Sequence, residues 1–293
     1  ARYNPTTNTW AILRDPPGRC TYSCLAYSSA RNTVVSVFGI DGASAQCPTY
    51  IYDIINDTWA TGTSPPARAG IVALNKAASA VFIDTIYIMC GQNTGGTDLP
   101  YAWEYNMAAD SWNVSIADVP TIGAVGRRSP CGSGLLISGN IFMFGGIDSG
   151  SGVASATAFK YNINTASWSS ITALPAARSA AGACSVGGTV YVINGLDAGL
   201  SDTDTVYAYD VATNAYTTLT VTNTAQAPIQ AVSADASIYR LGNVDFESYR
   251  LGNIPINFEE KYITRSSNPA FTTTAYFLPF GYPWNSISVT KPL

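Results

Sequence analysis

Short apolar runs that end in glycine recur along the chain and predict buried β-strands. Each run is rich in β-branched and aromatic residues and is bounded by turn-forming residues. The four clearest runs occupy residues 34–39, 86–91, 141–146 and 190–195. No run reaches the ~18 consecutive apolar residues that a membrane-spanning helix needs. The pattern therefore indicates an all-β fold, and we expect no membrane span.

A tyrosine followed seven residues later by a second aromatic residue occurs five times, with turn-rich sequence between the two. The pairs are Tyr3/Trp10, Tyr52/Trp59, Tyr105/Trp112, Tyr161/Trp168 and Tyr209/Tyr216. Their second members are 49, 53, 56 and 48 residues apart. A period near 50 residues indicates a structural unit repeated along the chain.

An arginine preceded by proline or small residues opens each unit. These arginines are Arg19, Arg68 and Arg178, with Arg128 in a looser copy. The order of opening arginine, strand of small residues, apolar strand ending in glycine, tyrosine and tryptophan resembles the kelch repeat. The resemblance covers residues 1 to about 220 well and the remainder poorly. It implies a β-propeller of four-stranded antiparallel blades around a central axis, in which neighbouring blades cover one another's faces.

The repeats predict four complete blades, at residues 19–63, 68–116, 127–172 and 178–221, and a degenerate fifth at 228–271. Residues 1–13 supply only the two outer strands of a blade. We favour six blades, in which residues 272–293 add the missing inner strands. The alternative is five blades with residues 272–293 as a tail. The chain thus divides into a propeller, 1–271, and a C-terminal extension, 272–293, which closes the propeller or docks on a neighbouring subunit.

Strand order predicts which loops share a face of the propeller. Loops that lead into each blade lie on the same side as loops between its second and third strands. We therefore expect Arg19, Arg68, Arg128, Arg178, Asp41, Asp148 and Asp197 to surround one mouth of the channel. Two interpretations stay open. The arginines either bind an anion or glycan, or pair with nearby aspartates and loop carbonyls and so stabilise the repeat.

Catalysis is not expected, because the chain contains no histidine. This removes the usual general base and the commonest zinc and copper ligand. Some kelch-like propellers resemble galactose oxidase, whose copper site needs histidine ligands that this chain lacks. The pairs Asp202/Asp204 and Glu259/Glu260 leave a carboxylate-only glycoside hydrolase as a less favoured possibility. Asp148, Asp202 and Asp204 are conceivable calcium ligands, but no calcium-loop pattern is present. We expect no cofactor and no metal.

Several features favour an extracellular protein. Six cysteines form an even set, and Cys20 and Cys47 are predicted to reach each other on the same face. Buried free thiols are the alternative for the inner-strand cysteines, Cys24, Cys131 and Cys184. Glycosylation sequons begin at Asn56, in an accessible loop, and at Asn113, on an outer strand.

The 15 basic and 19 acidic residues give a net charge of −4, which offers no attraction for nucleic acid.

The sequence therefore predicts a non-catalytic extracellular propeller that binds other proteins or assembles with copies of itself. A carbohydrate-binding propeller that uses the arginine-lined mouth is the alternative. Residues 271–284 contain six aromatic residues and no charge. Such a segment has to bury its rings, either within the chain or against another subunit.

Overall fold

The structure is a computed structural model that describes residues 2–4, 9–69, 73–120, 127–128, 131–148, 151–219, 230–234, 237–241 and 246–250. These residues form strands, turns and loops, with no helix among them. The predicted all-β class is confirmed. The second unit of the predicted domain division, residues 272–293, and the acidic pair Glu259/Glu260 lie outside the described residues.

Four sheets of four antiparallel strands match the four predicted complete blades. The first blade contains β3 (Cys24–Ser28), β4 (Thr33–Val37), β5 (Tyr50–Asp53) and β6 (Thr58–Thr61). The second contains β7 (Ala78–Phe82), β8 (Thr85–Met89), β9 (Ala102–Asn106) and β10 (Ser111–Asn113). The third contains β12 (Cys131–Ile137), β13 (Asn140–Phe144), β15 (Ala158–Asn162) and β16 (Ser167–Ile171). The fourth contains β17 (Gly182–Val186), β18 (Thr189–Ile193), β19 (Val206–Asp210) and β20 (Ala215–Leu219).

Three smaller sheets complete the described strands. β21 (Gln230–Ala234), β22 (Ser237–Leu241) and β23 (Phe246–Arg250) form a three-stranded sheet in the region of the predicted degenerate repeat. β1 (Arg2–Asn4) pairs with β2 (Thr9–Ala11), and β11 (Arg127–Arg128) pairs with β14 (Ile147–Asp148). The choice between six and five blades stays a prediction.

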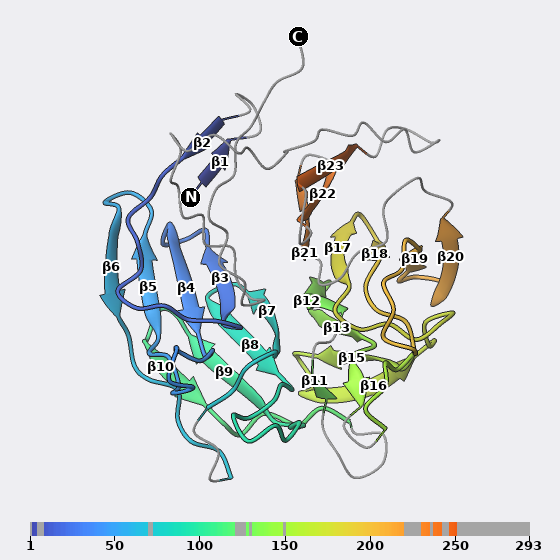
Figure 1. Cartoon of the computed structure of the whole chain (residues 1–293), viewed down its shortest axis with the longest axis horizontal. Coiled ribbons are helices and arrows are strands. Elements are labelled where there is room, and N and C mark those ends of the chain that lie inside the picture. The colour runs from blue at the N-terminus through green and yellow to red at the C-terminus, as the bar shows by residue number, and fades with distance from the viewer. Residues whose placement is uncertain are drawn as a thin grey trace.

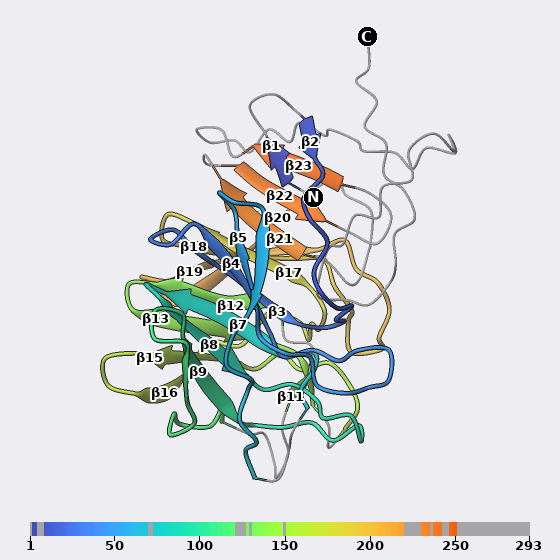
Figure 2. The same ribbon diagram turned by 90° about the vertical axis from the view of Figure 1, so that its left-hand side faces the viewer.

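The sheets follow one another in chain order around a ring (Figure 1). The first strand of each blade lies toward the centre, and the inner strands β3, β7, β12, β17 and β21 contact one another in that order. Figure 2 shows β21, β22 and β23 as one twisted sheet at the top of the molecule. Because both faces of a blade carry apolar side chains, each blade is stable only when blades on both sides cover it.

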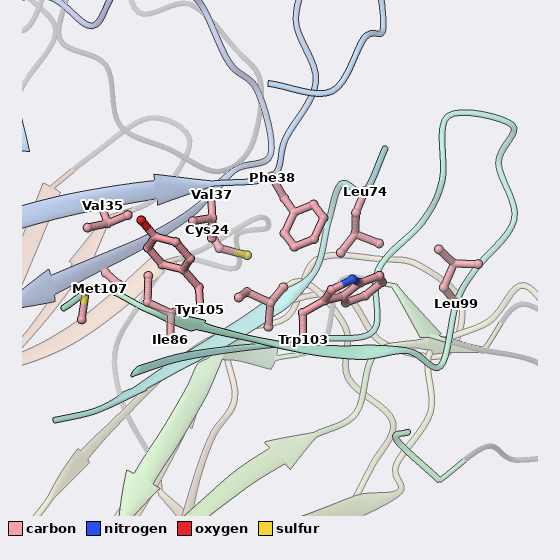
Figure 3. Packing of buried hydrophobic residues seen from close by; sticks show 12 residues of the cluster. Cys24, Val35, Val37, Phe38, Leu74, Ile86, Leu99, Trp103, Tyr105 and Met107 are labelled. Atoms are coloured by element: carbon pink, nitrogen blue, oxygen red, sulfur yellow. The ribbon is translucent and has the colours of Figure 1, made fainter. Parts of the chain in front are cut away.

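Apolar clusters fill the space between successive blades. The cluster between the first two blades contains Val35, Val37 and Phe38 on one side and Ile86 and Trp103 on the other (Figure 3). Phe38 meets the ring of Trp103 edge-on, with the centroids 5.1 Å apart. Similar clusters join the second blade to the third and the third to the fourth. The core is therefore divided among the junctions between blades, because each sheet directs apolar side chains toward both of its neighbours.

The tyrosine–aromatic pairs that define the repeat face each other across the two outer strands of each blade. The register pairs Tyr3 with Trp10, Tyr52 with Trp59, Tyr105 with Trp112, Tyr161 with Trp168, and Tyr209 with Tyr216. The spacing of seven residues thus reflects one tight turn between paired strands. The aromatic residue of the pair also contacts the neighbouring blade at Trp112, whose ring centroid lies 5.3 Å from that of Phe38.

A second residue of the repeat, five positions after the tyrosine, links neighbouring blades by hydrogen bonds. In the second blade Tyr105 Oη donates to Asp110 Oδ1 at 2.5 Å, and the backbone N–H of Thr63, which follows the first blade, donates to the same oxygen at 2.7 Å. Trp112 Nε1 then donates to the Thr63 carbonyl at 2.9 Å. Both backbone groups of Thr63 are therefore held by the next blade.

The same linkage recurs at two other junctions. Asp57 accepts from Tyr52 Oη at 2.6 Å and from the Arg14 N–H at 2.9 Å, while Trp59 Nε1 donates to the Arg14 carbonyl at 2.9 Å. In the fourth blade Asn214 takes the place of the aspartate, and Tyr216 Oη replaces the indole N–H. We call this arrangement the junction clamp.

Glycine at the end of the second strand is required by a close backbone crossing. At Gly39, where φ is +86°, a Cβ atom would lie 2.7 Å from the carbonyl oxygen of Thr21. At Gly195, where φ is +90°, it would lie 2.6 Å from the carbonyl oxygen of Ser179. Both the left-handed conformation and the lack of space exclude a side chain. These crossings bring together the two loop types that form the predicted mouth.

Candidate functional site

The loop that leads into a blade lies directly beside the loop between its second and third strands. Antiparallel bridges join Thr21 to Ile40 in the first blade and Ser179 to Leu196 in the fourth. Asp41 and Asp197 immediately follow the bridged residues Ile40 and Leu196. The structure therefore brings the two loop types together on one face, which we call the loop face.

The aspartates of the loop face close their own loops. Asp41 Oδ1 accepts hydrogen bonds from the N–H groups of Ala43 and Ala45, at 2.8 and 2.9 Å. Asp197 Oδ1 accepts from Gly199 and Ser201, at 2.8 and 3.0 Å. Neither forms an ion pair with an arginine in the described part of the chain, where Arg31 pairs with Asp84 and Arg68 pairs with Asp118. These carboxylates fix loop shape and are not gathered around a common centre.

The corresponding loops in the other two complete blades are also closed by hydrogen bonds to the residue at this position. Asn93 Oδ1 accepts from the Thr97 N–H at 2.8 Å, so an asparagine does in the second blade what aspartate does elsewhere. In the third blade the Asp148 carbonyl accepts from the Gly152 N–H at 2.7 Å. The sequence interpretation missed Asn93 because it searched for carboxylates. Its position two residues after the strand-ending Gly91 was the available signal.

Arg68 is held by its own blade. Its guanidinium donates to the carbonyls of Ala102 and Ile116 and forms an ion pair with Asp118 at 2.7 Å. It also lies over the ring of Tyr101, 5.2 Å from the centroid. These contacts occupy most of the donor groups of the side chain, which is the arrangement expected of a structural arginine.

Arg178 is buried, with 4% of its surface exposed. Its Nη2 donates to Tyr207 Oη at 3.1 Å, and its Nη1 donates to the Ala177 carbonyl at 2.8 Å. The guanidinium carbon lies 5.1 Å from the centroid of the Tyr207 ring. Nε has no hydrogen-bond partner among the residues that the structure describes. A ligand therefore cannot reach this arginine without a rearrangement of the loop.

The arginines of the sequence pattern do not occupy equivalent positions. The Arg178 carbonyl accepts from the Gly146 N–H, just as the Leu74 carbonyl accepts from the Gly39 N–H. Arg178 therefore corresponds to buried Leu74 and not to Arg68. Arg19 is exposed, and for Arg128 the structure describes the backbone, which pairs with Ile147. The arginines thus do not form a regular ring, because the incoming loops differ in length.

The predicted disulfide is present and lies at the loop face. Cys20 is bonded to Cys47 across a sequence separation of 27 residues, with the Cα atoms 6.1 Å apart. Cys24, Cys90 and Cys184 are buried thiols that form no disulfide in the described part of the chain, and the Cys90 thiol lies 3.8 Å from Met143 Sδ. The side chain of Cys131 is outside the described part. Burial raises the pKa of Cys24 and of Cys184 to about 12, which keeps both thiols protonated and unreactive.

The remaining candidate residues are dispersed. Asn56 is exposed in the turn between β5 and β6, and Asn113 is exposed at the end of β10, where its Nδ2 donates to Glu104 Oε2 at 2.8 Å. Asp202 and Asp204 are exposed on the loop before β19. No group of three or more potential metal ligands occurs within the described ranges.

Comparisons with known proteins agree with this architecture. Residues 177–220, which span the fourth blade, match the family model of the Kelch motif. The fold is that of a kelch-type β-propeller, and its fourth blade matches the Kelch motif. The propeller is 24% identical to the Kelch-like protein terF of Aspergillus terreus in an alignment 259 residues long, which covers 82% of this chain and 52% of the relative. It therefore spans about half the length of that relative.

The fold of the propeller also matches a solved structure. The structure of YjhT aligns with a TM-score of 0.65 at 16% identity, over 82% of this chain and 76% of YjhT. At this identity the match describes the fold alone. In the part of the propeller that the structure describes, no helix is long and apolar enough to cross a membrane.

Proposed function

We propose that this propeller is a non-catalytic extracellular module that binds another protein through its loop face. The observation that carries the proposal is the self-closure of the loops by Asp41, Asn93 and Asp197. Loops whose shape is fixed before binding lose little conformational entropy when a partner docks. Kelch repeats generally mediate protein interactions, which supports the same conclusion.

The chemistry of the loop face suits a protein partner. The loop tips carry small uncharged residues, and two of them present apolar side chains to solvent. Val153 is 42% exposed in the third blade, and Leu200 is 45% exposed in the fourth. Rigid loops with small polar residues and a few apolar contacts resemble the composition of many protein interfaces.

The absence of histidine from the sequence supports a non-catalytic role. The carboxylates of Asp41 and Asp197 accept hydrogen bonds from backbone N–H groups, and burial raises the pKa of the Cys24 and Cys184 thiols. An extracellular site of action is supported by the Cys20–Cys47 disulfide and by the exposure of Asn56 and Asn113.

A photo-crosslinking residue at position 200 tests the proposal. Ile83 is the matched control, because it is apolar, 76% exposed and located in a turn on the opposite face. We expect position 200 to crosslink to a protein from the medium in which the propeller occurs, and position 83 to give no such product. Equal crosslinking from both positions would contradict a specific role for the loop face.

The carbohydrate-binding alternative depends on free arginines, and the internal contacts of Arg68 and Arg178 argue against it. Replacing Arg178 by alanine separates the two roles. A structural arginine predicts a lower melting temperature, by a few degrees for a cost of roughly 1–2 kcal/mol. A glycan-array signal that disappears in a variant of unchanged stability would instead support carbohydrate binding.

A further inference from the structure

The Cys20–Cys47 disulfide is flanked by two contacts that join the first blade to the second at the loop face. Cys47 follows Gln46 in the loop between β4 and β5, and Cys20 lies two residues before Tyr22 in the loop that leads into β3. Gln46 and Tyr22 both contact the loop that leads into the second blade, residues 74–76, which we call the entry loop. Each half of the disulfide is therefore close in sequence to a residue that holds the entry loop.

Gln46 holds the backbone of Leu74. Its Oε1 accepts a hydrogen bond from the Leu74 N–H at 2.9 Å, and its Nε2 donates to the carbonyls of Gly39 and Cys47, both at 3.1 Å. The Gly39 N–H donates to the Leu74 carbonyl at 2.9 Å. Both backbone groups of Leu74, which is fully buried, are thus bonded to the first blade. Loss of the Gln46 contact leaves a buried N–H without its acceptor, which is unfavourable.

Tyr22 holds the other end of the entry loop. Lys76 Nζ lies 5.4 Å from the centroid of the Tyr22 ring and donates to Gln92 Oε1 at 3.1 Å. Tyr22 and Lys76 both adopt the left-handed conformation, with φ of 59° and 54°. Residues other than glycine keep this conformation only where the surrounding structure fixes it. A covalent bond two residues before Tyr22 contributes to that constraint.

The junction between the third and fourth blades makes the same link with backbone groups. Arg178 corresponds to Leu74, and its N–H donates to the Ser155 carbonyl at 3.0 Å. Ser155 corresponds to Cys47, because the N–H of each donates to the carbonyl of a glycine that ends the second strand. The acceptor at this junction therefore belongs to the backbone of a serine, whereas at the first junction it is a side chain beside the disulfide.

We propose that the loop face is redox-sensitive, and that Gln46 transmits the state of the Cys20–Cys47 disulfide to the entry loop. While the bond is intact, it fixes Cys47 and so keeps the Gln46 amide against the Leu74 N–H. When the bond is reduced, the loop between β4 and β5 separates from residue 20, and Leu74 loses its acceptor. The effect on binding rests on the proposed function of the loop face, since a loop whose shape is not fixed loses more conformational entropy when a partner docks.

The reduction is a thiol–disulfide exchange with a dithiol. A thiolate of the dithiol attacks Cys20 Sγ, because Cys20 is half-buried whereas Cys47 is buried. A mixed disulfide forms on Cys20, and the Cys47 sulfur leaves with the electron pair of the broken S–S bond and takes up a proton. The second thiolate of the dithiol then attacks the mixed disulfide, which releases Cys20 as a thiol and leaves the reductant as a cyclic disulfide. Two electrons and two protons thus pass from the dithiol to the protein.

Amide hydrogen exchange of the full chain, with and without dithiothreitol, tests the proposal. We expect reduction to accelerate exchange of the Leu74 N–H at least about tenfold. The Arg178 N–H is the matched control, because its acceptor is the Ser155 carbonyl, and its exchange is expected to change less than about twofold. Gln46→Ala in the oxidised chain is expected to give the same fast exchange at Leu74. Reduction of that variant is expected to add no further change there, because both changes remove the same contact.

Three results would overturn the proposal. Unchanged exchange at Leu74 after complete reduction, verified by thiol counting, would show that the disulfide does not control the entry loop. Equal acceleration at Leu74 and Arg178 would show that the bond stabilises the whole fold and not the loop face. A further acceleration when the Gln46→Ala variant is reduced would show that Gln46 is not the link.

The photo-crosslink at position 200 separates this proposal from the proposed function. If both hold, the yield of the crosslinked product is expected to fall at least about fivefold on reduction. A yield that persists in the reduced chain would overturn the regulation of binding and leave the proposed function standing. No product in either state would contradict the proposed function alone, because exchange at Leu74 is measured without a partner and decides whether the loop face is redox-sensitive.

Discussion

The junction between the first and second blades has a side-chain hydrogen-bond acceptor in its clamp where the junction between the second and third has an alanine. At the first, Asp110 accepts from both Tyr105 Oη and the Thr63 N–H. At the second, the residue five positions after Tyr161 is Ala166, which has no acceptor. Trp168 Nε1 still donates to the Ala117 carbonyl at 3.1 Å. Both residues adopt the left-handed conformation, with φ of 48° at Asp110 and 49° at Ala166.

The comparison separates two tasks of the repeat. The tight turn needs a residue that tolerates positive φ, a task for which aspartate and asparagine are better suited than alanine. The hydrogen bonds between blades need an acceptor at the same place. The third blade keeps the turn and the indole contact without the acceptor, so packing and one hydrogen bond are sufficient to hold a junction.

Asp110→Ala has the largest expected effect. Buried Tyr105 loses the acceptor of its hydroxyl group, the Thr63 N–H loses its partner, and alanine is less favourable at positive φ. We expect the free energy of unfolding to fall by about 2 kcal/mol. Thermal and urea unfolding measure the change. Asp110→Asn, which keeps an acceptor oxygen, is the control, and an equal loss in both variants would contradict the hydrogen-bond explanation.

Ala166→Asp is the converse experiment and has a smaller expected effect. The new carboxylate is placed to accept from Tyr161 Oη and to relieve the unfavourable conformation of alanine. We expect a gain of about 1 kcal/mol in the free energy of unfolding. Combining the change with Tyr161→Phe is expected to remove the part due to the hydroxyl group. A gain of the same size in that background would show that the backbone conformation alone is responsible.

Acidification is expected to weaken the aspartate clamps selectively. Hydrogen bonds from Tyr52 and from the Arg14 backbone lower the pKa of Asp57. Desolvation opposes the shift at Asp110, but the hydrogen bonds from Tyr105 and Thr63 outweigh it and lower its pKa. A depressed pKa in the folded state adds stability that is complete above the unfolded value of about 4 and is lost as the pH falls through the folded value.

The melting temperature of the wild type is therefore expected to fall between pH 6 and pH 3, and Asp110→Asn is expected to lose less over the same interval. The measurement is calorimetry at both pH values. An identical decrease in the two proteins would mean that Asp110 does not contribute to acid sensitivity.

Asn214→Asp has the smallest expected effect. The fourth blade already has an acceptor for Tyr209 Oη and for the Thr172 N–H, at 2.7 and 3.0 Å. At neutral pH the substitution is expected to change the free energy of unfolding by less than about 0.5 kcal/mol. Its signature is an additional loss of stability in acid, measured by the same calorimetry. A large change at neutral pH would show that amide and carboxylate are not interchangeable at this position.

The repeat made most of the fold predictable from the sequence. A tyrosine and an aromatic residue seven positions apart identified the outer strands, and an apolar run before glycine identified the second strand. The junction clamp was missed because its central residue varies among Asp57, Asp110, Ala166 and Asn214. Side-chain identity is not constant there, although the backbone conformation is.

The candidate site was less predictable, because loop length changes the position of a residue without changing its spacing from proline. Arg68 and Arg178 look alike in sequence, yet Arg178 occupies the place of Leu74. The Cys20–Cys47 pairing was predictable because it requires only that two loops share a face. Which arginines are buried depends on the path of each incoming loop, and no short motif encodes that path.

The disulfide has a consequence for local unfolding. Cys20 precedes β3 and Cys47 follows β4, so the bond encloses the inner hairpin of the first blade. The bond therefore ties together the two strands of this blade that lie nearest the axis and restricts their local opening. Amide hydrogen exchange is expected to be slower in β3 and β4 than in β5 and β6, and reduction of the disulfide is expected to abolish the difference.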